Sequence, residues 1–317
     1  MKTISVISPA YNEEENVREC HERVKRIFVE KLPDYQLEHI FADNASSDRT
    51  PEILQEMATE DENVKVIFNA RNFGPFRSLF NALRYATGDA VLVFLAVDLQ
   101  DPPELIPEFV QHWEQGIDIV AGARKNRQEA RWLRFSRMVF YRIVNGLSDF
   151  ELPPDVGEFQ LVDRKVWAAM MQHEDHYPYV RGIIASVGFK RLIIPYDWGV
   201  RQRGKSKNNL LRLIDQALNG IFSFTNAPLR FCIYLGFAIA VLCLLYGVFS
   251  VLAFLFAPAS APRGIPTLIA ALFFLSAVQM IFTGVLGEYV TSIHSQVRRR
   301  PLVIERGRLN IDQPGRD

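Results

Sequence analysis

Two long stretches without a charged residue limit the folds open to this chain of 317 residues. The first covers residues 231–257, and the second covers residues 265–287 and ends just before Glu288. Each is longer than the roughly 20 residues that a helix needs to cross a bilayer core. A pair of buried helices in a soluble core is the alternative, but soluble helices rarely lack a polar face over such lengths. The pattern predicts a transmembrane hairpin at 231–290.

Basic residues flank the predicted hairpin on both sides, whereas the segment that connects its two helices carries only Arg263. By the positive-inside rule, both termini are expected in the cytoplasm, with a short loop outside. The flanking residues are Arg201, Arg203, Lys205, Lys207, Arg212 and Arg230 before the hairpin, and Arg298, Arg299, Arg300, Arg306 and Arg308 after it.

The remaining chain divides into three segments: a soluble domain at 1–206, an interfacial amphipathic segment at 207–230 and a basic cytoplasmic tail at 291–317. Two stretches place apolar residues at helical spacing beside basic ones, which is typical of helices lying in a membrane interface. For residues 132–147, packing on the domain core explains the pattern equally well. For residues 209–224, continuity with the first apolar stretch favours the membrane.

Composition narrows the class of partner and the compartment. The 36 basic and 36 acidic residues balance, so no overall charge points to nucleic acid as a partner. The three cysteines are scattered without metal-ligand spacing, which fits a reducing compartment. The first 16 residues lack the apolar core and cleavage site of a signal peptide, and they are expected to begin a strand.

Strand-like and helix-like segments alternate through residues 1–200. This alternation predicts an α/β domain with a mostly parallel sheet and helices on both faces. The expected strands are 4–9, 38–42, 64–68, 90–95 and 118–122, and the expected helices are 13–30, 50–60, 76–87 and 103–115.

Polar clusters follow three of the expected strands, at 9–14, 42–50 and 96–101. In parallel sheets, ligands bind at the carboxyl ends of the strands. Helix caps and ordinary turns explain much of this polarity. They do not explain why Asp43 and Asp98 each follow an apolar strand directly, because a carboxylate there needs a partner such as a base, a ribose or a metal.

With these motifs in place, the chain resembles the family 2 glycosyltransferases with a GT-A fold. The matching motifs are SPAYNEEENV, ADNASSDRT, RNFG (71–74), DLQDPPELI (98–106) and ARKNR (123–127). The segments at 140–166, 220–231 and 287–290 narrow the resemblance to the membrane-anchored polyprenyl-phosphate glycosyltransferases, which include the dolichol-phosphate mannose synthases.

The resemblance implies transfer of a sugar from a nucleotide sugar to a lipid phosphate. It implies that Asp43 binds the base and that Asp98 with Gln100 holds Mg²⁺ or Mn²⁺ against the diphosphate. Asp98, Glu158 and Arg124 are the expected catalytic residues. The donor-binding residues implied in addition to Asp98 are Pro9, Tyr11, Glu13, Asp43, Arg71 and Arg201.

An anionic lipid phosphate needs positive charge and alignment more than a strong general base. Arg124, Lys125, Arg127 and Lys205 are candidates for binding this phosphate. Attraction to anionic membrane lipid, about 1 kcal/mol per residue near the surface, is the alternative role. Arg124 and Arg201 are expected in the site and the other basic residues nearer the headgroups.

The chain departs from the family pattern at several positions. Ala96 stands where the first of two paired aspartates is common, Asn44 where an acid is frequent, and Pro75 where a lysine is frequent. In the segment VGEFQLVDRK, expected as a loop, Glu158 replaces the usual aspartate and Gln160 the usual arginine. Glu158 remains a carboxylate that is able to act as a base or orient the acceptor.

The leading hypothesis is an inverting transferase that moves glucose from UDP-glucose to undecaprenyl phosphate at the bacterial inner membrane. GDP-mannose or UDP-GlcNAc as donor, and a catalytically weakened nucleotide-sugar-binding scaffold, are the alternatives. A flippase is disfavoured because the chain has only two predicted spans and a nucleotide site. Family resemblance implies a homotetramer. Asp98→Asn is expected to reduce turnover far more than Asp101→Asn.

Overall fold

The computed structural model describes residues 1–125, 138, 146, 151–175, 178–199, 227–256, 264–298 and 300–311. The chain forms two compact units. The first contains most of the first 209 residues together with the residues that follow 298, and the second contains two long apolar helices.

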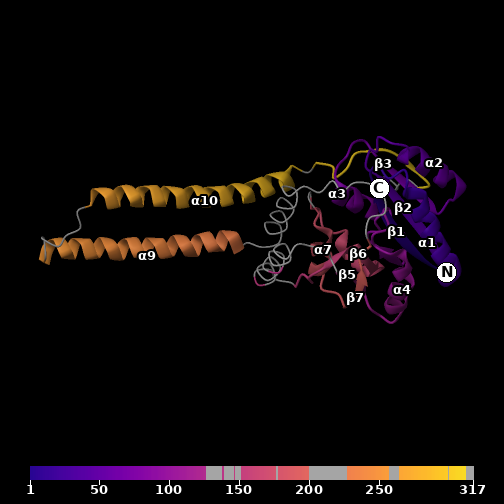
Figure 1. Ribbon diagram of the computed structural model, residues 1–317, viewed down its shortest axis with the longest axis horizontal. Helices are drawn as coiled ribbons and strands as arrows, with labels where there is room; N and C mark the ends of the chain where they lie inside the picture. Colours follow the sequence, from indigo (N-terminus) through magenta and orange to yellow (C-terminus); the bar gives the residue numbers. More distant parts are fainter. Residues whose placement is uncertain are drawn as a thin grey trace. The chain divides into compact units, whose positions relative to one another are not determined.

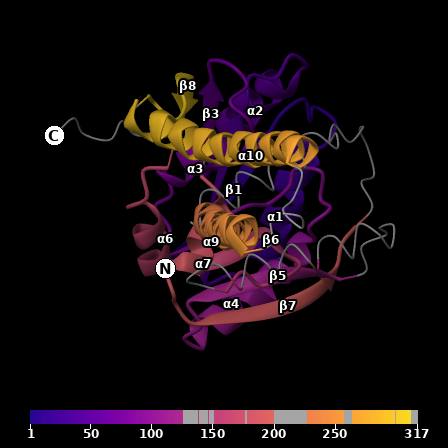
Figure 2. The same cartoon turned by 90° about the vertical axis from the view of Figure 1, so that its left-hand side faces the viewer.

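The first unit is built on an eight-stranded mixed sheet with the order β7-β5-β6-β4-β1-β2-β3-β8 (Figures 1 and 2). Strands β1 to β4 pair in parallel with one another, and so do β5 and β7, whereas β6 and β8 run antiparallel to their neighbours. The strands are β1 (Lys2–Ala10), β2 (Tyr35–Asp43), β3 (Val64–Asn69), β4 (Ala90–Leu92), β5 (Ile119–Lys125), β6 (Val156–Asp163), β7 (Arg191–Asp197) and β8 (Glu305–Leu309).

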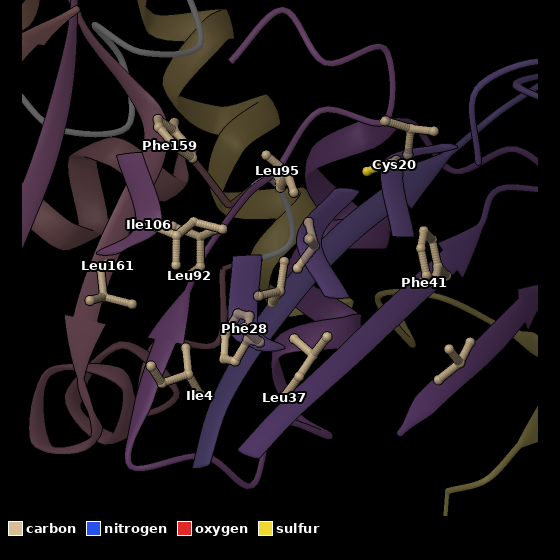
Figure 3. Close-up of a cluster of buried hydrophobic side chains, with 14 of the residues drawn as sticks. Ile4, Cys20, Phe28, Leu37, Phe41, Leu92, Leu95, Ile106, Phe159 and Leu161 are labelled. Carbon is tan, nitrogen blue, oxygen red and sulfur yellow. The ribbon is translucent and has the colours of Figure 1, made fainter. Parts of the chain in front are cut away.

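Helices cover both faces of this sheet. The helices α1, α2 and α4 pack on one face, where alternate strand residues such as Ile4 and Phe41 join them in the main core (Figure 3). The other strand residues, such as Ile7, face the opposite side, where α3 contacts β1 and β2. The helices are α1 (Val17–Lys31), α2 (Thr50–Glu60), α3 (Pro75–Leu83), the 3₁₀ helix η1 (Pro103–Leu105), α4 (Ile106–Glu114), α6 (Arg164–Met170) and α7 (Val180–Ser186).

The α/β fold predicted from the alternating pattern is confirmed, and each of the five expected strands corresponds to an observed one. Three strands were not expected. The segment with Glu158 and Gln160 is strand β6 and not a loop. Strand β8 lies within the segment that was expected to be a basic tail, and it extends the sheet beside β3.

The second unit contains α9 (Ala227–Phe256) and α10 (Ile265–Val297), which contact each other. Both are long and apolar enough to cross a membrane, over Phe231–Phe249 and Ala271–Val297. Large apolar side chains are exposed along both, as at Phe237 (72%) and Met280 (76%). This exposure argues against the buried soluble hairpin, because such surface is costly in water. Helix α10 continues beyond residue 290, where the predicted hairpin ended.

Two histidines lie in the core of the first unit. His39 on β2 is fully buried, and its ring contacts the Ser8 hydroxyl (Oγ to Nε2, 3.0 Å) and His21 of α1 (Nδ1 to Nδ1, 3.1 Å). His21 also lies 3.6 Å from the Asp61 carboxylate. Burial lowers the pKa of both histidines, and the effect on His39 is strong. The folded protein therefore favours both rings in the neutral form.

We expect the stability of this unit to fall as the pH drops below about 6.5, the ordinary pKa of histidine. There the unfolded histidines take up protons that the folded ones exclude, so protons favour the unfolded state. Thermal melts of the full chain between pH 8 and pH 5 measure the fall. His39→Gln is expected to flatten it, and His112→Gln, on the partly exposed face of α4, serves as the control. Equal slopes in wild type and His39→Gln would contradict the assignment.

Candidate active site

The loops that follow β1 and β2 are joined by hydrogen bonds. Asn12 has a left-handed backbone conformation (φ 55°), its amide donates to Ser46 Oγ (2.9 Å), and its side-chain oxygen accepts the Ser47 amide (2.8 Å). The Glu13 amide donates to Thr50 Oγ1 (2.9 Å). These contacts bring together two of the three polar clusters expected from the sequence.

Asp43 ends β2 with its side chain fully buried. Its two carboxylate oxygens accept the Ser46 amide at 3.2 and 3.3 Å. Burial raises the pKa of Asp43, and this effect outweighs the Ser46 hydrogen bonds and the charge of Arg306, which lower it. The carboxylate is an acceptor held in a fixed orientation at the carboxyl end of the sheet.

Asn44 explains one departure from the family pattern. Its side-chain oxygen accepts from Asn69 Nδ2 (3.2 Å) and the Phe73 amide (2.9 Å), while its nitrogen donates to Asn72 Oδ1 (3.0 Å). An ionised aspartate lacks a donor and would lose the last of these bonds. Asn44 therefore holds the RNFG loop against the end of β2.

Four of the predicted donor-binding residues surround this edge. Pro9 lies near the end of β1, opposite Ala42. Tyr11 is 37% exposed, and the Glu13 carboxylate accepts from Asn16 Nδ2 (2.7 Å). Arg71 is exposed, with its guanidinium 4.0 Å from the centre of the Phe73 ring. The structure thus places Pro9 near the end of β1 and the other three on loops at the same end of the sheet, as the parallel topology requires.

The third polar cluster reaches the same edge. The chain beyond β4 stays beside β1, because the Leu95 amide donates to the Ile7 carbonyl (2.8 Å). Leu99 then takes a left-handed conformation (φ 56°), and the Gln100 amide donates to Asp98 Oδ1 (3.3 Å). Asp98 also lies near α1, since its charge adds to the burial that raises the pKa of Cys20 to about 12. Asp98 is half-buried and follows Leu95, the residue bonded to Ile7 of β1, by three positions.

The residues around Asp98 suit a divalent ion shared with substrate. Among the described residues, no group of three His, Cys, Asp or Glu side chains is placed to hold a metal by itself. A hard cation such as Mg²⁺ takes one or two protein oxygens and completes its shell with phosphate and water. Asp98 fits that role. Gln100 is oriented by the backbone at Gly199, because its Nε2 donates to the Gly199 carbonyl (3.3 Å).

Arg124, a predicted catalytic residue, is held in a buried cluster. Its guanidinium lies 3.1 Å from the fully buried Asp101 carboxylate and 4.8 Å from the centre of the Trp198 ring. Tyr196 also donates a short hydrogen bond to Asp101. Burial opposes the charge of Arg124, but Asp101 and Tyr196 outweigh it and raise its pKa. Much of its positive charge is thus compensated within the protein.

The remaining predicted residues are placed as follows. Glu158 on β6 lies 3.7 Å from the Arg181 guanidinium of α7. Gln160 is buried, with its side-chain nitrogen donating to the Gly157 carbonyl (2.7 Å), so it fills the strand interior. Lys125, at the end of β5, is exposed. Arg127, Arg201 and Lys205, and the amphipathic stretches 132–147 and 209–224, lie wholly or almost wholly outside the described residues.

Two residues near the site were missed from the sequence. Arg181 belongs to no recognised motif, and only the fold brings it to Glu158. Arg306 was counted only as part of a basic tail, yet its charge acts on Asp43. Sequence spacing contained no signal for either, because both contacts join segments far apart along the chain.

Comparison with known proteins agrees with the fold and the motifs. The family model for glycosyl transferase family 2 matches residues 5–169, and the model for the GtrB C-terminal hairpin matches residues 227–293. An uncharacterized glycosyltransferase of Synechocystis sp. is 35% identical over 95% of this chain and 94% of its own length.

Two further relatives are also 35% identical over 95% of this chain. They are a prophage bactoprenol glucosyl transferase homolog of Escherichia coli K12, covered over 97% of its length, and the bactoprenol glucosyl transferase of Shigella phage SfII, covered over 96%. With a GT-A-type α/β domain followed by this hairpin, the chain belongs to glycosyl transferase family 2 and is a glycosyltransferase.

Proposed function

We propose that this enzyme transfers glucose from UDP-glucose to a polyprenyl phosphate, such as undecaprenyl phosphate, with inversion at the anomeric carbon. The observation that carries the proposal is the convergence of the loops after β1, β2 and β4, which gathers Asp43 and Asp98 at one edge of the sheet. Relatives named as bactoprenol glucosyl transferases that match nearly the whole chain support the lipid acceptor and the glucose.

In this proposal the two carboxylates have separate tasks. Asp43 accepts a hydrogen bond from the nucleoside part of the donor, because it ends β2 at the carboxyl edge of the sheet and Ser46 fixes its carboxylate. Asp98, with Gln100 next to it, would hold Mg²⁺ or Mn²⁺. When bound, the cation neutralises the charge that develops on the departing nucleoside diphosphate.

The acceptor phosphate supplies the nucleophile in a single displacement. One of its oxygens forms a bond to the anomeric carbon as the bond to the UDP oxygen breaks, and the electron pair leaves with UDP. A phosphate that is already ionised needs no strong base, so Glu158 acts as an orienting group held by Arg181. Because Asp101 compensates much of the charge of Arg124, we assign Arg124 a structural role in the buried cluster with Asp101 and Tyr196.

The apolar hairpin of α9 and α10 suits an acceptor substrate that lies in the membrane, the polyprenyl phosphate. Helices α9 and α10 have the length and apolar surface to sit in the membrane that holds a polyprenyl chain. We infer that both termini and the α/β domain lie on the cytoplasmic side, from the basic flanks. The lipid-linked sugar would serve cell-surface glycan modification, and assembly as a homotetramer remains an expectation from family resemblance.

A transfer assay tests the proposal. The purified full chain is incubated in detergent with undecaprenyl phosphate, Mg²⁺ or Mn²⁺, and one radiolabelled donor at a time: UDP-glucose, GDP-mannose or UDP-GlcNAc. We expect metal-dependent label in the organic phase, with UDP-glucose preferred. Preference for another donor would change the assigned donor sugar but keep the assignment as a transferase. Nucleotide binding without transfer from any donor would instead support the scaffold that Ala96 and Gln160 suggest.

A further inference from the structure

Strand β8 returns the chain from the end of the second helix to the edge of the predicted donor site. The Ala70 amide, directly before Arg71, donates to the Ile304 carbonyl (2.8 Å). The Glu305 carboxylate accepts from Asn81 Nδ2 (2.5 Å) and the Tyr85 hydroxyl (2.9 Å). Residues from the end of the chain therefore support the loop that carries the RNFG motif.

A β-bulge changes the direction of the side chains in β8. Phe68 pairs with Gly307 and Asn69 pairs with Glu305, so Arg306 opposes no residue of β3. Bulges of this kind redirect side chains and are frequent beside active sites. Glu305 consequently faces α3, while the Arg306 guanidinium lies 5.9 Å from the centre of the Phe68 ring.

Asp43 shares this face of the sheet. It lies directly opposite Phe68 in the β2–β3 ladder, and opposite residues project their side chains on the same side. Arg306 thus stands next to the residue that neighbours Asp43, at the carboxyl ends of the parallel strands. Its side chain is exposed and is open to a ligand bound there.

We propose that Arg306 is a positioning residue of the donor site, whose positive charge stabilises the ionised Asp43 carboxylate that binds the nucleoside part of the donor. This proposal rests on the proposed function and extends it, because it assigns the C-terminal strand to donor recognition. An arginine here contributes a fixed positive charge and several N–H donors without titrating in the physiological range.

The electrostatics of Asp43 show what Arg306 contributes. Burial and the charge of Asp48 raise the pKa of Asp43, whereas the Ser46 hydrogen bonds and Arg306 lower it. Only the ionised carboxylate offers both oxygens as acceptors to a base N–H or a ribose hydroxyl. Removing Arg306 should therefore raise the pKa of Asp43 and move the acidic limit of nucleotide binding to higher pH.

Titration calorimetry of the full chain with UDP and Mg²⁺, from pH 5 to pH 8, tests this role. Arg306→Ala is expected to weaken UDP binding about tenfold at pH 6 and less at pH 8. Arg306→Lys keeps the charge and should restore most of the pH profile. Arg308→Ala is the matched control, because Arg308 pairs with Glu305 on the other side of β8.

Each outcome of these titrations either supports or overturns the role of Arg306. Unchanged UDP affinity and an unchanged pH profile in Arg306→Ala would overturn the role of Arg306 while leaving the proposed function in place. An equal loss of affinity in Arg306→Ala and Arg308→Ala, with no pH dependence, would show that β8 acts only as structural support and would overturn it too. A wild-type chain that neither binds UDP nor transfers sugar would overturn both proposals.

Discussion

Replacing Asp98 with Asn is expected to reduce sugar transfer by about a hundredfold or more, with little change in stability. The substitution removes the negative charge that holds the metal ion, and losses of this size are typical when such a group is removed. The asparagine oxygen still accepts the Gln100 amide, so the turn at Leu99 is kept. Organic-phase label under saturating UDP-glucose and a thermal melt measure the two effects.

Asp34→Asn is the matched control for this experiment. It makes the same chemical change at an exposed position just before β2, at the opposite end of that strand from Asp43. Turnover of this variant should equal that of wild type. If Asp98→Asn also retained wild-type turnover with Mg²⁺ and Mn²⁺, the metal assignment would be refuted.

Asp101→Asn is expected to produce the largest loss of stability. Asp101 is fully buried, and its partner Arg124 has a side chain that is only 18% exposed. Removing one member of a buried pair leaves an uncompensated charge and costs about 3–5 kcal/mol of unfolding free energy. For a domain of this size, the melting temperature should fall by roughly 10 °C. Thermal melts of the full chain at pH 7.5 measure it.

Two further variants distinguish the effect of the ion pair on stability from the effect of the other contacts in this cluster. Tyr196→Phe removes the hydrogen bond to the charged Asp101 carboxylate and the bond that Tyr196 accepts from Arg124 Nε (3.3 Å), and it should cost about 2 kcal/mol. Combining Asp101→Asn with Arg124→Gln removes both charges and should recover part of the lost stability. A double variant no more stable than Asp101→Asn would show that the ion pair is not the cause. At assay temperatures where both variants are folded, Asp98→Asn should reduce turnover more than Asp101→Asn.

The predicted parts of the fold are those encoded by local pattern. The apolar runs at β1 to β5 and the helical segments between them are continuous in sequence, so periodicity alone indicated them. The uncharged stretches at α9 and α10 were equally clear because a bilayer core demands about 20 apolar residues. Strand β8 escaped because it reads ERGRL and carries three charged residues. Strand β6 (VGEFQLVD) contains apolar residues but was taken for a loop, and the short apolar run of β7 (RLIIPYD) ends at Pro195.

The candidate active site also contains residues that local pattern predicts and residues that only the fold brings together. Asp43 and Asp98 were identified because each follows an apolar strand, a position where an unpartnered carboxylate is costly. From the sequence, Asp101 was expected to matter less for turnover than Asp98. The fold buries it against Arg124 and Tyr196. Those three residues come from separate segments, and local spacing carries no information about such contacts.

By itself, the sequence determined the α/β domain, the apolar hairpin, the family and the two carboxylates at the strand ends, because these depend on local periodicity and short motifs. Only the tertiary structure decided that Arg124 is paired, that Glu158 lies in a strand beside Arg181, and that the C-terminal segment adds Arg306 to the donor edge. The physical reason is that ion pairing and strand addition depend on contacts between segments distant in sequence, which form only when these segments pack together in the folded domain.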